Sequence, residues 1–221
     1  MKTFGRCVSV VATLMMESRF RRLRTDLVSV YSAYRASLRS RLPDVVVTTL
    51  VAAEDRGFAR HAGVELVPTL WMLSRLAAAR RPGRRASIEQ RLVRILLGRP
   101  PRRLGAGIRE ILLASLVGRV IPKADVAGVY LFVAYFGWRM NGIREACSRL
   151  GFNVVTLTPL QAASVIARLR YPEQPTMSDE RARQIAMRAR RILRLVEGES
   201  GGRRMEAGAP TCVESSSLRG T

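Results

Sequence analysis

Cysteine, histidine and acidic residues are scarce in this sequence of 221 residues. The three cysteines, Cys7, Cys147 and Cys212, are widely spaced and odd in number, so they match neither a disulfide framework nor a metal site and leave the redox compartment open. The apolar, uncharged run Val126 to Trp138 is shorter than the roughly 20 residues that a transmembrane helix needs. A transmembrane span is therefore not expected.

Acidic residues are outnumbered by basic ones, 17 against 38, and the net charge is +21. Such an excess indicates a polyanionic partner, which is a nucleic acid, an anionic membrane surface or a phosphate-bearing substrate. Nearly all the basic residues are arginine, a side chain suited to bidentate phosphate recognition, although a GC-rich coding sequence has the same effect on composition. The 48% of hydrophobic residues suffices for one globular core.

The N-terminal segment combines an apolar run, Cys7 to Met16, with four arginines between positions 19 and 24. A secretory signal would need a longer apolar region and a small-residue cleavage site. One interpretation is an amphipathic helix that lies on an anionic membrane. The other, which we favour, is a first core-packing helix with a solvated basic face.

Apolar residues recur at helical spacing along most of the chain, and strand patterns are scarce. The expected helices cover residues 1–41, 45–58, 66–80, 88–97, 108–120, 123–136, 142–150, 159–169 and 178–197. Basic loops are expected at 80–85 and 98–105, and capping boxes at Ser87/Gln90 and Thr158/Gln161. We therefore predict a mainly α protein with a basic N-terminal segment (1–43), one domain (44–197) and a disordered tail (198–221).

One short stretch is unusual in its chemistry. The charge-free run Val45 to Ala53 ends directly in two carboxylates, Glu54 and Asp55, and the only histidine, His61, follows. Burial of the run would carry the carboxylates to the rim of the core, where a poorly solvated carboxylate can exchange a proton. The alternative is an ordinary polar helix end, and the local pattern does not choose between the two.

The same stretch resembles the first signature of the peptidoglycan glycosyltransferases, the transglycosylase modules of bifunctional penicillin-binding proteins and their monofunctional relatives. The family pattern is Glu-Asp-Arg-x-Phe-x-x-His-x-Gly-Val-Asp. It is matched here at seven positions, with Glu65 in place of the final Asp: Glu54, Asp55, Arg56, Phe58, His61, Gly63 and Val64. Spacing and order agree at all seven.

Further signatures follow in family order. Residues 86–95 align with Ser-Thr-Ile-Thr-Gln-Gln-Leu-Val-Lys/Arg-Asn, and residues 106–114 align with Arg-Lys-x-x-Glu-Ile-Leu-Leu-Ala. The fourth region is matched at Lys123, Tyr130, Leu131, Gly137, Gly142 and Ile143. The resemblance covers about residues 44 to 195.

The resemblance implies a lysozyme-like helical domain with basic loops and a hexosyltransferase activity. Such an enzyme polymerises lipid II into glycan strands during cell-wall synthesis, which maintains cell shape, and releases a lipid pyrophosphate. Glu54 would be the general base that takes the proton of the acceptor's 4-hydroxyl. Glu110 would be a second carboxylate that steadies charge at the pyrophosphate, through a divalent cation such as Mg²⁺ or Mn²⁺.

The remaining residues carried over by position would bind substrate: Asp55, Arg56, Phe58, His61, Ser87, Gln90 and Arg94. Simpler local roles stay open for some of them. Ser87 and Gln90 suit a capping box, His61 suits a turn, and Glu110 suits an exposed helix face. The implied partners are lipid II, the growing glycan strand, the membrane surface and other cell-wall synthesis proteins, but no nucleic acid. The implied location is peripheral, on the outer or periplasmic face of the cytoplasmic membrane.

The chain departs from the family signatures at several positions. Ala106-Gly107 stands where the family has Arg-Lys, cations that face the pyrophosphate, and Arg91 stands where it has Gln. Ile95 and Phe132 replace two Asn residues. These departures leave open a degenerate homologue that binds lipid II or anionic lipid without turnover, and charge alone leaves open a helical nucleic-acid-binding domain. No transpeptidase domain is expected, and the N-terminal basic helix either docks on the membrane or is preceded by a missing segment.

Overall fold

The computed structural model describes residues 2–61, 86–98 and 104–206, and the side chains of residues 17–61, 86–98 and 109–198. The long or central helices are α1 (Lys2–Ser37), α2 (Asp44–Glu54), α4 (Ile88–Leu96), α5 (Leu104–Ala114), α6 (Lys123–Val133), α7 (Ile143–Arg149), α8 (Pro159–Ala167) and α9 (Asp179–Glu206). Short 3₁₀ turns cover Phe58–Arg60, Val117–Arg119 and Val154–Thr156, and one hairpin joins β1 (Tyr135–Gly137) to β2 (Met140–Asn141). The prediction of a mainly α protein is confirmed.

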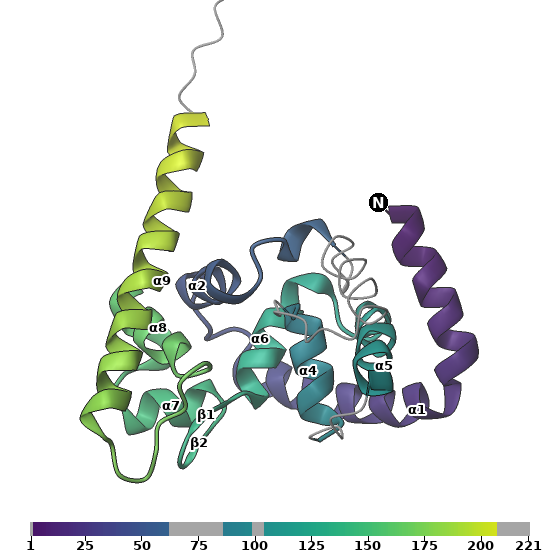
Figure 1. Cartoon of the computed structure of the whole chain (residues 1–221), viewed down its shortest axis with the longest axis horizontal. Helices are drawn as coiled ribbons and strands as arrows, with labels where there is room; N and C mark the ends of the chain where they lie inside the picture. The colour runs from purple at the N-terminus through teal and green to yellow at the C-terminus, as the bar shows by residue number, and fades with distance from the viewer. Residues whose placement is uncertain (1, 62–85, 99–103, 207–221) are drawn as a thin grey trace, which may run out of the picture.

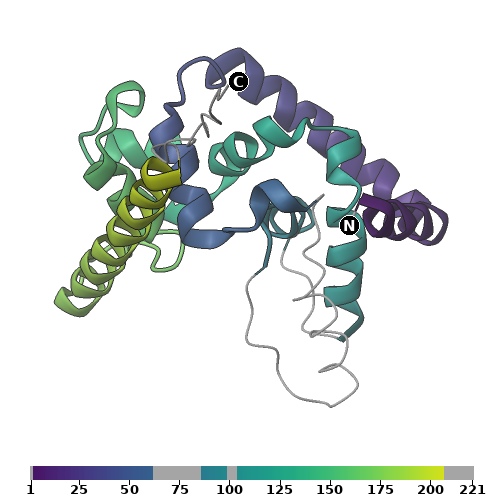
Figure 2. The same ribbon diagram turned by 90° about the horizontal axis from the view of Figure 1, so that it is seen from above.

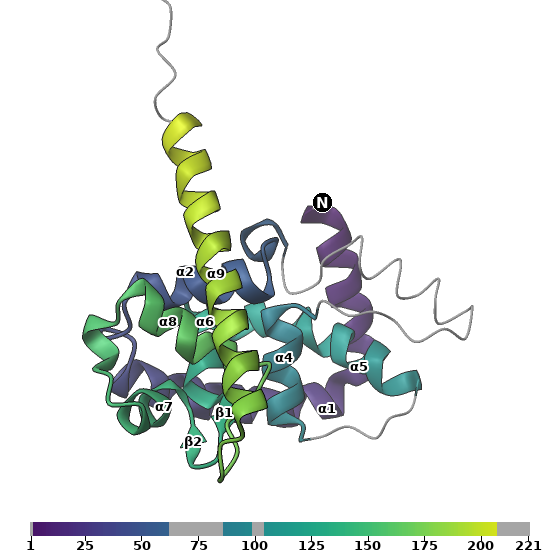
Figure 3. The ribbon, with the colours of Figure 1, turned by 60° about the vertical axis from the view of Figure 1, so that its left-hand side comes forward.

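Helix α6 lies in the middle of the molecule, with helices on either side of it (Figure 1). On one side α4 packs against α5 and α6, and α1 runs across α5 and α6. On the other side α2 packs against α8 and α9. The two long helices, α1 and α9, therefore lie at opposite ends of the molecule, as the view from above also shows (Figure 2). A side view shows α8 and α9 close together (Figure 3).

The C-terminal half of α1 belongs to the core. Its apolar side chains Leu23 and Leu27 are fully buried, and Leu38, directly after the helix, is 2% exposed. A side chain at Gly128 of α6 would collide with the Tyr34 ring, so this glycine permits the close approach of α1 and α6. Core packing, the interpretation that we favoured, thus holds for this half of α1, which shares one core with the helices that follow.

Several predicted boundaries differ from those observed. The predicted helix 123–136 ends at Val133, because Ala134 is extended and Gly137 and Arg139 adopt positive φ in the β1–β2 turn. Helix α9 continues to Glu206, so residues 198–206 are helical rather than disordered, whereas residues 207–221 lie outside the described part of the chain. The predicted helix 66–80 and the basic loop 80–85 also lie outside it.

Two predicted helix starts are observed. Thr158 and Gln161 form the expected reciprocal capping box, with Pro159 in the first turn of α8. Ser87 caps α4, since its Oγ accepts the Gln90 amide at 3.2 Å. Among the described helices, none combines the length and apolar character that crossing a membrane requires.

Candidate active site

Glu54 is the last residue of α2, and its side chain is only 5% exposed. The preceding apolar run buries Val46 and Leu50 completely as α2 packs against α8, α9 and α6. A helix that is apolar over its length is drawn into the core, and its final carboxylate is drawn in with it. The prediction that the run carries Glu54 to the edge of the core agrees with this geometry.

Two guanidinium groups hold the Glu54 carboxylate. Arg91 of α4 lies 2.6 Å from Oε2, and Arg188 of α9 donates to Oε1 at 2.8 Å. A buried carboxylate needs such partners, because its lost hydration is otherwise uncompensated. The side chains of Arg91 and Arg188 are 25% and 21% exposed, so both cations lie at the border between core and solvent.

Glu110 of α5 is the second candidate catalytic carboxylate, and it is buried rather than exposed. Arg94 of α4 binds it in bidentate fashion, with Nε 2.9 Å from Oε2 and a terminal nitrogen 2.6 Å from Oε1. Bidentate pairs of this kind fix orientation as well as charge. Arg94 thereby supplies a cation at the point where the family resemblance implied a divalent ion.

Helix α4 connects the two carboxylates. Arg91 and Arg94 are three residues apart, so they share one face of the helix. One reaches Glu54 and the other reaches Glu110. Burial raises the pKa of the neighbouring Tyr130 phenol above its usual value, and the Glu54 carboxylate adds to this while Arg91 and Arg94 oppose it. The two arginine–carboxylate pairs therefore line one face of α4, and the neutral phenol of Tyr130, from α6, lies next to them.

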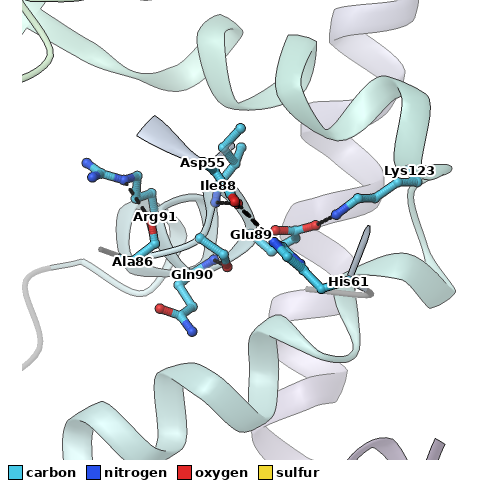
Figure 4. A network of polar contacts seen from close by, with 9 residues as sticks. Asp55, His61, Ala86, Ile88, Glu89, Gln90, Arg91 and Lys123 are labelled. Atoms are coloured by element: carbon cyan, nitrogen blue, oxygen red, sulfur yellow. Dashed lines mark hydrogen bonds and ion pairs between the residues drawn. The ribbon is translucent and has the colours of Figure 1, made fainter. Parts of the chain in front are cut away.

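Asp55 and His61 of the first signature belong to a second, buried network beside these pairs (Figure 4). Asp55 accepts from His61 Nε2, at 3.1 and 3.2 Å for its two oxygens, and from the Ile88 amide at 3.2 Å. Glu89 pairs with Lys123, whose ammonium lies 3.7 Å above the Phe58 ring. These contacts fasten the segment 55–61 to the first turn of α4.

The predicted substrate-binding residues fall into two groups. Asp55 and His61 have side chains that are 3% exposed, Phe58 is 7% exposed and Ser87 is engaged in capping, so these four belong to the buried framework of the site. Arg94 and Gln90 are partly exposed, and Arg56 is exposed. Direct substrate contact by any of them stays a prediction.

Four residues of the site were not proposed from the sequence: Glu89, Arg91, Lys123 and Arg188. The first two had a signal, since Glu89 stands at a Thr position and Arg91 at a Gln position of the second signature. Lys123 matches the fourth signature, but the resemblance implied no substrate-binding or catalytic role for it. Arg188 had no signal, because α9 carries arginine at many positions.

Comparison with known proteins defines the class of protein. A model of the transglycosylase family matches residues 26–197, and the chain therefore belongs to the transglycosylase family. It is 29% identical over 170 residues to the biosynthetic peptidoglycan transglycosylase of Bordetella pertussis. The aligned region covers 73% of this chain and 69% of that relative.

Penicillin-binding proteins are also similar to this chain. It is 28% identical over 162 residues to penicillin-binding protein 1A of Rickettsia felis, covering 71% of this chain and 20% of that protein. It is 29% identical over 136 residues to penicillin-binding protein 1A of Escherichia coli, covering 61% and 16%. The chain thus spans a fifth or less of these longer relatives, and the family resemblance stated from the motifs is confirmed.

Proposed function

We propose that this transglycosylase-family chain polymerises lipid II into glycan strands of peptidoglycan and releases a lipid pyrophosphate. The observation that carries the proposal is the placement of Arg91 and Arg94 on one face of α4, against the buried carboxylates Glu54 and Glu110. It combines a proton acceptor, a second carboxylate and fixed cations, which a transfer from a pyrophosphate donor requires.

In the proposed step, the acceptor's 4-hydroxyl oxygen forms a bond to the donor's anomeric carbon, and the hydroxyl proton passes to Glu54. The bond between the anomeric carbon and the pyrophosphate oxygen breaks, and the electron pair leaves with the pyrophosphate. Both Glu54 oxygens are engaged by guanidinium groups, and exchange of one arginine from the carboxylate to a pyrophosphate oxygen would leave Glu54 a better proton acceptor. The incoming anion supplies the driving force for that exchange.

Arg91 and Arg94 also address the largest departure from the family signatures. The cations that the family places before the second carboxylate are replaced here by Ala106-Gly107. In the proposal, the two arginines of α4 take over contact with the pyrophosphate. The protein acts peripherally on the outer or periplasmic face of the cytoplasmic membrane, where its positive charge favours anionic lipid. The growing glycan strand and other cell-wall synthesis proteins are its proposed partners.

A second candidate function is lipid II binding without turnover. The observation that favours it is that both candidate catalytic carboxylates are already compensated by arginine. If these pairs persist in the complex with lipid II, the paired carboxylates are weak acceptors for the hydroxyl proton. The arginines would then serve binding alone.

The deciding experiment incubates labelled lipid II with the wild type and with Glu54→Gln. We expect polymer from the wild type and a loss of at least about 10²-fold in Glu54→Gln, with lipid II binding nearly unchanged. Glu180→Gln, at an exposed carboxylate on α9, is the matched control and should retain activity. Binding without polymer under every metal condition establishes the second candidate. Failure to bind lipid II, with salt-dependent binding of duplex DNA, indicates a nucleic-acid-binding domain instead.

A further inference from the structure

Three side chains with metal-binding chemistry meet beneath the candidate active site. Asp55, His61 and Glu89 each offer one donor atom, and these atoms lie within 4.8 Å of one another. Asp55 and His61 come from the segment after α2, and Glu89 comes from the first turn of α4. Glu54 and Glu110 are not part of this group.

The cluster contains a buried oxygen without a partner. Glu89 is 2% exposed, and its Oε2 makes no hydrogen bond to any described residue, while its other oxygen pairs with Lys123. Figure 4 shows the Glu89 carboxylate between the Lys123 ammonium and the Asp55–His61 pair. An unpaired buried carboxylate oxygen is costly, so this atom calls for a partner at that point.

We propose that Asp55, His61 and Glu89 bind a divalent transition-metal ion of the Zn²⁺ or Mn²⁺ type. An imidazole with two carboxylates suits these ions, whereas Mg²⁺ and Ca²⁺ prefer oxygen ligands alone. Ligands about 2.1 Å from one metal ion lie about 3.0 Å apart in octahedral geometry and about 3.4 Å apart in tetrahedral geometry. His61 Nε2 and Asp55 Oδ1 are 3.1 Å apart, which fits two neighbouring ligands of one ion.

The ion would join two parts of the chain. Asp55 directly follows Glu54, and His61 ends the same segment. Glu89 belongs to α4, the helix that carries Arg91 and Arg94. Metal binding therefore fixes the position of Glu54 relative to α4. Glu89 distinguishes this chain from the family pattern, since the second family signature has Thr at that position. Binding of the metal alone is independent of lipid II polymerisation, so either can fail without the other.

Lys123 makes the site testable through competition. Its ammonium shares the Glu89 carboxylate and rests on the Phe58 ring, so it is a cation that the metal ion must tolerate. Replacement of Lys123 by Met removes that repulsion and keeps an apolar chain against the ring. Metal affinity in Lys123→Met should rise. If Glu89 pairs with Lys123 and binds no metal ion, the metal affinity of Lys123→Met will not exceed that of the wild type.

The experiment uses the untagged, metal-free full chain, because His61 is the only histidine and its imidazole signals are unambiguous by NMR. We expect Zn²⁺ to shift these signals with one ion bound per chain, and Mn²⁺ to broaden them. Calorimetric titration with Zn²⁺ should show that Glu89→Gln and Glu89→Thr lower the affinity at least about tenfold. Glu145→Gln, at an exposed carboxylate, should leave it unchanged.

The NMR titration requires no substitution, so it decides the matter even where a variant fails to fold. Histidine signals that do not respond to saturating Zn²⁺ or Mn²⁺ overturn the proposal. An affinity that is the same in the wild type and Glu89→Gln also overturns it. Equal sensitivity to Glu89→Gln and Glu145→Gln identifies adventitious surface binding and overturns it as well.

Discussion

The two candidate catalytic carboxylates are both buried and both paired with arginine, but their pairs are built differently. Glu110 is bound in bidentate fashion by Arg94, 16 positions away on the adjacent helix. Glu54 is shared by Arg91 and by Arg188, which lies 134 positions away on α9. The first pair depends on the contact of α4 with α5. The second depends on the docking of α9 against α2 as well.

This difference indicates which carboxylate is easier to free. Arg94 contacts both oxygens of Glu110, so its release removes two charge-assisted hydrogen bonds at once. Each oxygen of Glu54 has its own guanidinium, so one can leave while the other still compensates the charge. Glu54 can therefore offer a free oxygen to the acceptor's hydroxyl without losing its place in the fold. We expect the base to be Glu54 and the stabilising carboxylate to be Glu110.

The largest expected effect comes from neutralising the carboxylates one at a time. Glu54→Gln removes the proton acceptor and should lower the polymerisation rate by about 10² to 10⁴-fold. Glu110→Gln removes only a stabilising charge and should lower it by about 10-fold to 10²-fold. Single-turnover assays with labelled lipid II measure both rates. Equal losses in the two variants would contradict the division of roles.

The next largest effect concerns stability. Arg94→Met leaves the bidentate acceptor Glu110 buried and should reduce the free energy of unfolding by about 2 to 3 kcal/mol, less than for a fully buried pair because Arg94 is about one-third exposed. Arg188→Met should cost about 1 kcal/mol, since Arg91 continues to compensate Glu54. Urea unfolding followed by circular dichroism measures both. A larger loss in Arg188→Met would show that α9 docking governs the site.

A smaller effect is expected for Arg91→Gln, which introduces the residue of the family signature. If Arg91 contacts the pyrophosphate, the variant should lower kcat/KM about tenfold, mainly through KM. Polymerisation at several lipid II concentrations separates KM from kcat. An increase in kcat would instead show that Arg91 only restrains Glu54. Arg149→Gln, at an exposed position on α7, is the control for loss of positive charge.

The sequence predicted the helical class, the burial of the run before Glu54 and the cap at Ser87, because each depends on local pattern. The hairpin was missed, since its strands of three and two residues directly follow an apolar helix and carry no alternation of their own. The pairing of Arg188 with Glu54 was also out of reach. It depends on how α9 docks, and nothing local separates that arginine from its neighbours on the same helix.

The smallest expected effect uses Cys147 of α7 as a reporter of whether these substitutions leave the core closed. Burial raises the pKa of its thiol to about 11, so the reactive thiolate is rare at pH 8 and alkylation should be slow. The rate should rise as the pH approaches 11, because deprotonation of the folded state then becomes possible. Peptide mapping after iodoacetamide treatment resolves this cysteine from the other two. Alkylation at pH 8 should remain slow in Arg91→Gln and become faster in Arg94→Met. Fast alkylation in both variants would mean that both arginine pairs are needed to keep the core closed. Glu54 and Glu110 would then differ in their catalytic roles but not in their contribution to stability.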